Sequence, residues 1–491
     1  MVKNLIIFIA FVVIYQSCSK EIVIYDSEIS SNFELGLILE MNGKDCLFDS
    51  KTSTLKYSLA QANLINFSPK VKFQSYSSIT FNGNELTNNS INNLGTIELH
   101  KKYPVKVTTL DETKSFNLIF TDIPLVQIVT RDKIPNEPKV LGKLILHQPE
   151  LSVFKESWIN IEIRGASSAL KEKTSFGFNT IYDKRNLDLK PTQFFSMAVN
   201  SKWILDALYI DKSKVRNRTT TELWKEMNPT NAGIKSRFVE VFVNNEMIGL
   251  YSFNENYTES YLSLNNQSIL ISGIDNSETT KFEKIPTQPT NSSIWGDWEQ
   301  KIPDPSTRLE WPEFQSFCEL VISSSDQEFV SKIAAKLNLD NIIDYYLFVN
   351  VCNGYDNVGK NYFFLKRDAS SKFEIVVWDL DATWGRDSEG GTKSSTQIIS
   401  NALFDRLIEL EPNGFKFKLK NRWNELRATT YSHANITSLF NSNVTELINY
   451  NSIDTENAIW NTATNLVSEQ GYINNWTASR LIFLDSYFSN L

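Results

Sequence analysis

The hydrophobic pattern of the chain changes near Asp122, and this change limits the possible architecture more than any other feature. From about Ser19 to Thr121, short alternating runs such as KVKFQSYSSITF and SFNLIFT are separated by clusters of Asn, Gly, Asp and Ser, a pattern typical of a β-sandwich. After TDIPLVQIVT, strand-like runs such as WINIEIRG alternate with helical stretches such as KSKVRNRTTTELWKEM, which predicts α+β structure. We therefore expect a small all-β module of the immunoglobulin-like (Ig-like) type over residues 19–121 and an α+β domain over residues 122–491.

One segment of the larger domain, from Asn265 to Arg308, is rich in Ser, Thr, Asn and Pro and has weak periodicity. We interpret it as a long insertion or lid and not as a domain boundary. A chain of 491 residues has room for such an insertion beside two domains that each have their own core.

The first residues, MVKNLIIFIAFVVIYQSCSK, have the features of an export signal, with an early cation at Lys3 and an apolar run from Leu5 to Ile14. These 10 apolar residues are too few to cross a bilayer, which needs about 20. The cysteine directly after the apolar region is typical of a bacterial lipoprotein, so we predict a signal peptide over residues 1–18 and lipid on Cys18. Tyr15 stands where Leu is usual, so ordinary secretion is the alternative. Both interpretations predict a location outside the cytoplasm: the cell envelope, with the lipid anchor in the outer membrane or at the cell surface, or the medium.

Composition excludes several classes of chemistry. The net charge of −8 argues against nucleic acid as a main partner, because a duplex-binding protein needs clustered Lys and Arg. The chain has only three His, none of them paired at i,i+4, and besides Cys18 it has three Cys without CxxC spacing. Neither a zinc site nor a disulfide framework follows from such a pattern. The chemistry must therefore depend mainly on carboxylates, amides, Lys and Arg.

The most informative stretch is GYDNVGKNYFFLKRDASSKFEIVVWDLDATWG, from Gly354 to Gly385. Its beginning nearly fits the phosphate-binding P-loop pattern GxxxxGK[ST], but Asn361 replaces the hydroxyl residue. A P-loop also needs a strand before it and a helix after it, whereas here a helical stretch precedes the loop and the strand NYFFLK follows. We therefore reject the P-loop.

The same stretch fits the spacing of a kinase catalytic loop better. In that arrangement Asp356 acts on the attacking hydroxyl, Asn361 binds a divalent ion, and Asp379 binds the ions that bridge the phosphates. Hard oxygen donors suit Mg²⁺ or Mn²⁺. If the run after FEIVVW is extended, Asp379 and Asp381 share a face and both approach one ion. The alternative is that these residues only form turns, since Asp and Asn are common turn formers. The run FEIVVW favours the metal, because carboxylates at the end of a buried strand need compensation.

Five blocks give the region from about Asp122 to the C-terminus a family resemblance. They are IRGASSALKEKTSF, WILDALYIDKSKVRN, VEVFVNNEMIGLYSFNE, DNVGKNYFFLK and VVWDLDATWG. With these blocks the chain resembles the CotH kinase family, which comprises secreted atypical protein kinases related to spore coat protein H. The resemblance implies an atypical protein-kinase-like fold, ATP and Mg²⁺ or Mn²⁺ as cofactors, and transfer of the γ-phosphate to a Ser or Thr of a protein substrate.

Residue roles follow from the same resemblance. Asp356 matches the catalytic Asp, Asn361 the metal-binding Asn, and Asp379 the family's metal-binding Asp. Arg164 and Lys173 match basic positions expected near the nucleotide phosphates. The chain departs from the family pattern at Ala166, which replaces an Asn, and at Asn245, which replaces a Gly. Four further residues are expected to be structural partners: Arg216, Asn217, Glu240 and Glu255.

Three functions are compatible with the sequence. The first is an exported ATP-dependent protein Ser/Thr kinase. The second is a surface adhesion or scaffold lipoprotein whose kinase-like domain is weak or inactive, against which the intact Asp356, Asn361 and Asp379 argue. The third is metal-dependent hydrolysis by the carboxylates of WDLD, which ranks last because the sequence has no second cluster of metal ligands.

Overall fold

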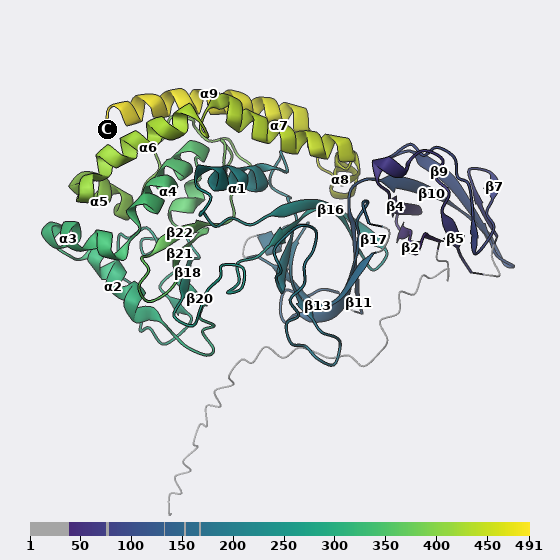
Figure 1. Cartoon of the computed structure of the whole chain (residues 1–491), viewed down its shortest axis with the longest axis horizontal. Helices are drawn as coiled ribbons and strands as arrows, with labels where there is room; N and C mark the ends of the chain where they lie inside the picture. Colours follow the sequence, from purple (N-terminus) through teal and green to yellow (C-terminus); the bar gives the residue numbers. More distant parts are fainter. Residues whose placement is uncertain (1–38, 75–77, 132, 152–153, 166–167) are drawn as a thin grey trace, which may run out of the picture.

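The computed structural model describes residues 39–74, 78–131, 133–151, 154–165 and 168–491. The predicted signal peptide and Cys18 lie outside the described residues. The chain has an α+β fold in which an all-β part comes first, a barrel follows, and a helical part with its own sheet comes last (Figure 1). The α+β class predicted from the sequence is confirmed.

Two sheets form the first part of the chain. Their strands alternate in the expected way: on β9, Tyr103, Val105 and Val107 are buried while Pro104 and Lys106 between them are exposed. The buried side chains of the two sheets form one core between Leu39 and Phe120. The smaller sheet has the order β2-β1-β5-β8 and contains β1 (Glu40–Met41), β2 (Lys44–Asp45), β5 (Lys70–Lys72) and β8 (Ser90–Ile91). The larger sheet has the order β3-β4-β10-β9-β6-β7 and contains β3 (Leu47–Asp49), β4 (Thr54–Ser58), β6 (Ser78–Phe81), β7 (Asn84–Glu85), β9 (Lys102–Thr108) and β10 (Thr113–Thr121).

A closed barrel follows, in the order β11-β12-β13-β14-β15-β17-β16. Alternating apolar residues fill its interior, among them Val126 and Ile128 of β11 and Leu144 and Leu146 of β12. The parallel pairing of β11 with β16 closes the barrel. The strands are β11 (Leu125–Thr130), β12 (Val140–His147), β13 (Lys155–Arg164), β14 (Ser175–Ile181), β15 (Lys202–Asp206), β16 (Ser236–Val243) and β17 (Glu246–Glu255).

The barrel and the first part of the chain share buried contacts. The Lys56 ammonium group lies 2.7 Å from the Glu240 carboxylate, and these side chains are 8% and 2% exposed. Asp49 accepts a hydrogen bond from the backbone N–H of Met247, and Leu47 belongs to the large core of the helical part. The two parts are therefore joined by more than a linker.

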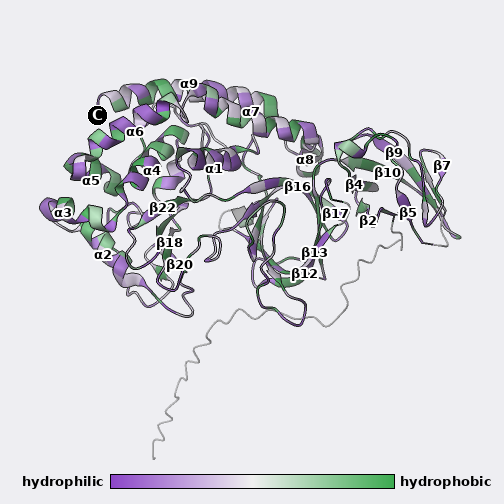
Figure 2. Cartoon of the chain, in the orientation of Figure 1, coloured by the Kyte–Doolittle hydropathy of each residue, from purple (hydrophilic) through white to green (hydrophobic). Residues whose placement is uncertain are grey.

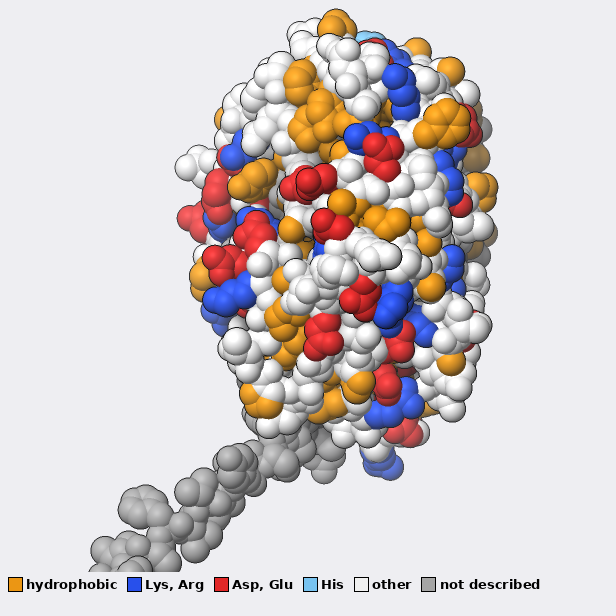
Figure 3. All heavy atoms as spheres, turned by 90° about the vertical axis from the view of Figure 1, so that its left-hand side faces the viewer, with side chains coloured by type: hydrophobic (Ala, Val, Ile, Leu, Met, Phe, Trp, Pro, Cys, Tyr) orange, Lys and Arg blue, Asp and Glu red, His pale blue; other side chains and the backbone are white. Residues whose placement is uncertain are grey.

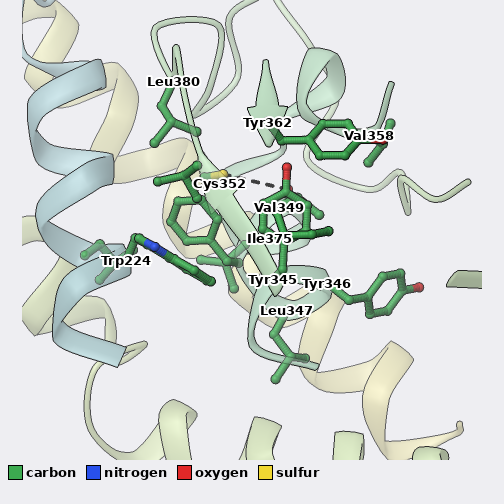
Figure 4. Close-up of a cluster of buried hydrophobic side chains, with 14 of the residues drawn as sticks. Trp224, Tyr345, Tyr346, Leu347, Val349, Cys352, Val358, Tyr362, Ile375 and Leu380 are labelled. Carbon is green, nitrogen blue, oxygen red and sulfur yellow. Dashed lines mark hydrogen bonds between the residues drawn. The ribbon is translucent and has the colours of Figure 1, made fainter. Parts of the chain in front are cut away.

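The helical part is built around α4 (Leu339–Cys352), of which almost every residue is buried. Figure 4 shows Tyr345, Val349 and Cys352 of α4 beside Trp224 of α1 and Tyr362 of β21. Helices α6, α7 and α9 cover one side and alternate hydrophobic with hydrophilic residues, as surface helices do (Figures 1 and 2). The other helices and later strands are α1 (Arg216–Met227), α2 (Trp311–Ile322), α3 (Asp326–Lys336), α5 (Ala402–Leu410), α6 (Phe415–Ala428), α7 (His433–Tyr450), α8 (Ile453–Trp460), α9 (Leu466–Ser489), β18 (Ile269–Gly273), β19 (Ile294–Trp295), β20 (Trp298–Ile302), β21 (Tyr362–Lys366) and β22 (Glu374–Val377).

The interpretation of residues 265–308 as an insertion or lid is wrong. This segment contributes β18, β19 and β20 to a sheet of order β19-β20-β18-β21-β22, in which β18 pairs with β20 and β21. Trp295 and Trp298 are fully buried there. The strands are short, and the Ser, Thr and Asn residues between them obscure the alternation of apolar and polar residues that would predict strands. The sheet is recognised only from the pairing of β18 with β21, about 90 positions later.

The surface of the end formed by α2, α3 and α5 carries acidic and basic side chains interspersed with each other (Figure 3). No helix within the described ranges is long and apolar enough to cross a membrane.

Candidate active site

The loop that carries Asp356 and Asn361 is held between α4 and β21. Helix α4 ends at Asn353 in the left-handed conformation, and a short 3₁₀ turn over Tyr355–Val358 contains Asp356. Asn361 has a φ of +59°, which Asn tolerates better than most residues, and it turns the chain into β21. The helix before the loop and the strand after it are those that the sequence predicted.

Asn357 fastens this loop to the end of β22. Its side-chain amide donates to the carbonyl oxygen of Asn361 at 3.0 Å and to that of Trp378 at 2.9 Å. The Asn357 side chain is buried, so these bonds are protected from competition by water. The loop of Asp356 therefore lies beside Asp379, as the kinase-like spacing predicts, although sequence reasoning did not identify the residue that holds the two together.

The run after β22 is not extended. Asp379 has a φ of +51°, and no strand continues beyond Val377. The expectation that Asp379 and Asp381 share one face of an extended run is therefore wrong, because the left-handed residue turns the chain. The two carboxylates still interact, since the negative charge of Asp379 contributes to the raised pKa of Asp381.

The surroundings of these carboxylates raise their pKa values. Desolvation by the surrounding protein is the main cause for both, although Asp379 keeps contact with solvent. The negative charge of Asp206 raises the pKa of Asp379 further and Arg164 opposes this shift, while Asp379 and Asp206 raise the pKa of Asp381. A cation bound near these carboxylates would be attracted by their negative charges.

Asp206 is a member of the site that sequence reasoning missed. It ends β15 and accepts hydrogen bonds from the backbone N–H of Leu208 at 3.2 Å and the amide of Asn217 at 3.4 Å. Asn217 in turn accepts from the backbone N–H of Leu380, which connects Asp206 to the segment of Asp379 and Asp381. The signal was present, because Asp206 lies inside the block WILDALYIDKSKVRN.

Two cations, Arg164 and Lys360, lie near the carboxylates of the candidate site. Arg164 ends β13, lies with its guanidinium 5.6 Å from the ring centre of Trp378, and is attracted electrostatically by Asp379 and Asp206. Lys360 lies 3.4 Å from the Asp356 carboxylate and also acts on Asp379. Sequence reasoning named Arg164 and not Lys360.

Lys173 is placed differently from Arg164. Its ammonium group is fully buried, lies 2.6 Å from Glu456 of α8, donates to the Leu250 carbonyl oxygen and lies 4.4 Å from the ring centre of Tyr251. Burial lowers the pKa of Lys173 to about 8, while Glu456 opposes this shift. In this arrangement Lys173 already has its partners and does not face an open site.

The expected structural partners also make buried contacts. Arg216 is enclosed and binds Asp211 at 2.7 Å and Glu469 at 2.6 Å. Glu255 accepts from the backbone N–H groups of Ala198 at 2.6 Å and Lys235 at 2.7 Å. These contacts join distant segments of the domain.

The residues near Asp379 are of the chemical type that binds divalent cations. Within the described residues, no group of three His, Cys, Asp or Glu side chains is arranged to hold a metal ion. The carboxylates of Asp379 and Asp381 and the amide of Asn361 are nevertheless hard oxygen donors of the type that Mg²⁺ and Mn²⁺ prefer. Burial and, to a smaller extent, the neighbouring carboxylates raise the pKa values of both groups, and a bound cation would favour their ionised forms.

The chain is similar to proteins that are already known. A curated relative is inner spore coat protein H of Bacillus subtilis (strain 168), with 24% identity over 212 residues, which is 42% of this chain. The chain spans 57% of the length of that relative. Among solved structures, the crystal structure of a Helicobacter pylori proinflammatory kinase CtkA matches 60% of this chain and 94% of that chain, with 10% identity and a TM-score of 0.23, a similarity too small to carry an argument.

The family model described as CotH kinase protein matches residues 161–484. This range includes the loop of Asp356 and Asn361, the carboxylates after β22, and both Arg164 and Lys173. Because the match covers more than half of the chain, the resemblance predicted from the five sequence blocks is confirmed, and the chain belongs to the CotH kinase protein family.

Proposed function

We propose that this protein is an exported atypical protein kinase that transfers the γ-phosphate of ATP to a Ser or Thr hydroxyl of a protein substrate. The observation that carries the proposal is the pair of hydrogen bonds from Asn357, which hold the loop of Asp356 beside the segment of Asp379. Membership of the CotH kinase protein family supports the same reaction class. ATP as the donor and Ser or Thr as the acceptor belong to the proposal.

Asp356 acts as the general base in the proposed reaction. Its carboxylate accepts the proton of the substrate hydroxyl while the hydroxyl oxygen forms a bond to the γ-phosphorus. The bond between the γ-phosphorus and the bridging oxygen breaks, and ADP leaves with that oxygen. Lys360, at 3.4 Å, balances the charge of Asp356 and orients its carboxylate.

Asp379, Asp381 and Asn361 hold the divalent cation in this proposal. When bound, Mg²⁺ or Mn²⁺ neutralises charge on the phosphate oxygens. Asp206 accepts a hydrogen bond from the amide of Asn217, which in turn accepts from the backbone N–H of Leu380, and these bonds fix the segment of Asp379 and Asp381.

Arg164 is the cation proposed to contact the nucleotide phosphates, since it is attracted electrostatically by Asp379 and forms no ion pair with the described residues. Lys173 takes the role assigned from the family resemblance only if its ammonium group is released from Glu456. Without that rearrangement, Lys173 is a positioning residue that holds α8 against β17.

A thermal shift experiment tests the proposal. ATP with Mg²⁺ or Mn²⁺ should stabilise the wild type by about 2.7 kcal/mol at a hundredfold excess over the dissociation constant. Asp379→Ala should lose most of this shift, while Asp188→Asn, on an exposed loop, should keep it. If no nucleotide stabilises the wild type, the protein is not an ATP-dependent kinase.

The second candidate is a surface adhesion or scaffold protein with a weak or inactive kinase-like domain. The closed ion pair of Lys173 with Glu456 favours it, because a cation assigned to the phosphates is engaged elsewhere. Under this alternative, the chain binds neither nucleotide nor Mn²⁺ with useful affinity, so the same thermal shift separates the two candidates.

The remaining parts of the proposal concern architecture and location. We propose a kinase-like fold for residues 122–491, an Ig-like module for residues 19–121, and a lipid anchor on Cys18 after removal of the signal peptide. The name of the relative, inner spore coat protein H, supports a location outside the cytoplasm. Membrane association of the wild type and of Cys18→Ala after detergent-free lysis tests the anchor, and equal association in both would refute it.

A further inference from the structure

A small basic pocket lies at the end of the barrel opposite the end that carries Arg164. It has a volume of about 270 Å³ and is lined by the segment after β12, the connection before β15, the first turn of α1 and the start of β16. In the antiparallel pair β12 and β13, Leu146 lies opposite Lys155, the first residue of β13, whereas Arg164 ends β13. The pocket and the site of Arg164 therefore lie at opposite ends of the barrel.

Three cations line the pocket, and their charges are not fully paired. Arg237 contacts Glu150 and Glu446 only at 3.7 Å and 3.9 Å, and the exposed Lys235 forms no ion pair with the described residues. Arg218 is better paired, with Glu222 at 3.1 Å and Glu446 at 2.9 Å, but neither of these carboxylates lines the pocket.

The polar atoms that lack partners at this pocket are donors. Nη1 of Arg218 and Nε of Arg237 can only donate, Oγ of Ser236 can donate, and all three are buried without a hydrogen-bond partner in the described structure. Leaving such groups unpaired is unfavourable. Because the two ion pairs of Arg237 are long, its guanidinium is free to turn toward an acceptor in the pocket.

We infer that this pocket binds a phosphate-type oxyanion, either inorganic phosphate or the phosphate monoester of a Ser side chain. Lys235 and Arg237 supply two positive charges that the described carboxylates pair weakly or not at all, whereas Arg218 is bound by Glu222 and Glu446. A phosphate dianion neutralises two charges and a carboxylate only one. The fork of a guanidinium also matches phosphate oxygens geometrically. The volume suits a phosphate group and is below the range of roughly 300 to 1,000 Å³ that is typical of pockets for larger ligands.

The experiment measures phosphate binding to the full chain by calorimetry, in EDTA and at constant ionic strength. Lys235→Gln and Arg237→Gln should each weaken binding about tenfold or more, because each removes a charged contact. The matched controls Lys106→Gln on β9 and Arg185→Gln on an exposed loop should change it less than about twofold. Arg218 is left intact, since its substitution would also break two ion pairs of the fold.

A further variant separates this pocket from the candidate active site. If Arg164→Gln abolishes phosphate binding while Arg237→Gln leaves it unchanged, the phosphate binds at the active site and the inference is wrong. The inference also fails if the wild type binds no phosphate. A phosphoserine peptide that binds more tightly than inorganic phosphate identifies a phosphorylated protein as the ligand, and equal or weaker binding identifies free phosphate. Loss of nucleotide binding in Asp379→Ala does not affect this result, so the two proposals fail independently.

Discussion

At the scale of single residues, the acidic side chains of the candidate site differ in what surrounds them. Asp356 lies on a 3₁₀ turn beside Lys360, whereas Asp379 lies in a left-handed turn among Asp206, Asp381 and Arg164. A carboxylate with one cationic neighbour suits proton transfer. Carboxylates crowded together suit a metal ion.

This difference predicts a division of labour between two variants. Asp356→Asn should lower phosphate transfer to a Ser-rich protein by about two orders of magnitude or more, yet leave ATP affinity nearly unchanged, because it removes the base and no ligand. Asp379→Ala should weaken ATP binding in Mn²⁺ but not in EDTA. Asn361→Ala should do so more mildly, because a neutral amide attracts a cation less than a carboxylate does. ATP affinity with and without Mn²⁺, measured beside transfer, checks this prediction, and unchanged transfer in both Asp variants would contradict it.

A second residue, His147, makes stability depend on pH. Its side chain is buried at the end of β12, and Nε2 has no hydrogen-bond partner in the described structure. Burial, and to a smaller extent the positive charge of Lys44, lowers the pKa of His147 to about 3. The ordinary value near 6.5 applies to the unfolded chain, so the unfolded state binds the proton more readily.

Stability contributed by the neutral imidazole is therefore complete above pH 6.5 and is lost as the pH falls toward 3. The free energy of unfolding should fall by up to about 1.4 kcal/mol per pH unit in this window because of His147 alone. In His147→Phe, unfolding should take up about one proton fewer than in the wild type, so the free energy of unfolding should fall less steeply with decreasing pH. Urea unfolding between pH 4 and pH 7 measures this dependence. The control His433→Gln changes an exposed imidazole, and an equal slope in His147→Phe and the wild type would exclude His147 as the cause.

At the scale of elements, the short helix α8 is attached to the barrel by charged and polar contacts. Glu456 binds the ammonium group of Lys173 at 2.6 Å and accepts from the backbone N–H of Leu250 at 2.9 Å. The indole N–H of Trp460 donates to the carbonyl oxygen of Ile248. Gly249 stays small because a Cβ there would lie 2.3 Å from a carboxylate oxygen of Glu456.

Removing one of the two charges of the buried Lys173 and Glu456 pair should lower the free energy of unfolding strongly. Glu456→Gln leaves the Lys173 charge buried without its counter-charge and should lower the free energy of unfolding by about 3 kcal/mol or more. The double variant Lys173→Met with Glu456→Gln should cost less than the sum of the single variants, since neither charge is then left alone. Lys332→Gln, which removes an exposed ion pair in α3, should cost under about 1 kcal/mol. Additive losses in urea unfolding would show that the two groups do not act as a pair.

At the scale of the whole molecule, the all-β part and the barrel are coupled. The buried Lys56 and Glu240 pair and the contacts of Asp49 and Leu47 would be lost if the chain began at residue 122. The fragment 122–491 contains every residue proposed to bind nucleotide, so it should bind ATP with the affinity of the full chain. It should nevertheless unfold at a lower temperature, because Glu240 loses its partner.

Replacing Glu240 in the fragment tests this explanation. Glu240→Gln should recover part of the lost stability in the fragment and should destabilise the full chain, in which Lys56 would be left unpaired. Thermal unfolding of the four proteins gives the comparison. A folded fragment that fails to bind ATP while the full chain binds it would contradict the proposed assignment of the nucleotide site.

Local patterns in the sequence determined much of this protein. The period-two alternation before Asp122 predicted strands, WINIEIRG predicted β13, and the order of helix, loop and strand around Asp356 was correct. These features depend on neighbours within a few positions, so a single sequence contains them. The five blocks also identified the family, because residues needed for one site recur with recognisable spacing.

Only the tertiary structure decided which distant residues meet. Glu456 lies 283 positions after Lys173, and no local pattern indicates that the two charges pair. The strand β18 became recognisable only through its pairing with β21, and the left-handed turn at Asp379 replaced the expected extended run. Asp206 joins the site because Asn217 connects it to Leu380. Such contacts depend on how elements pack across the whole chain, which is why composition and periodicity predicted the parts of the site but not the partners that hold them.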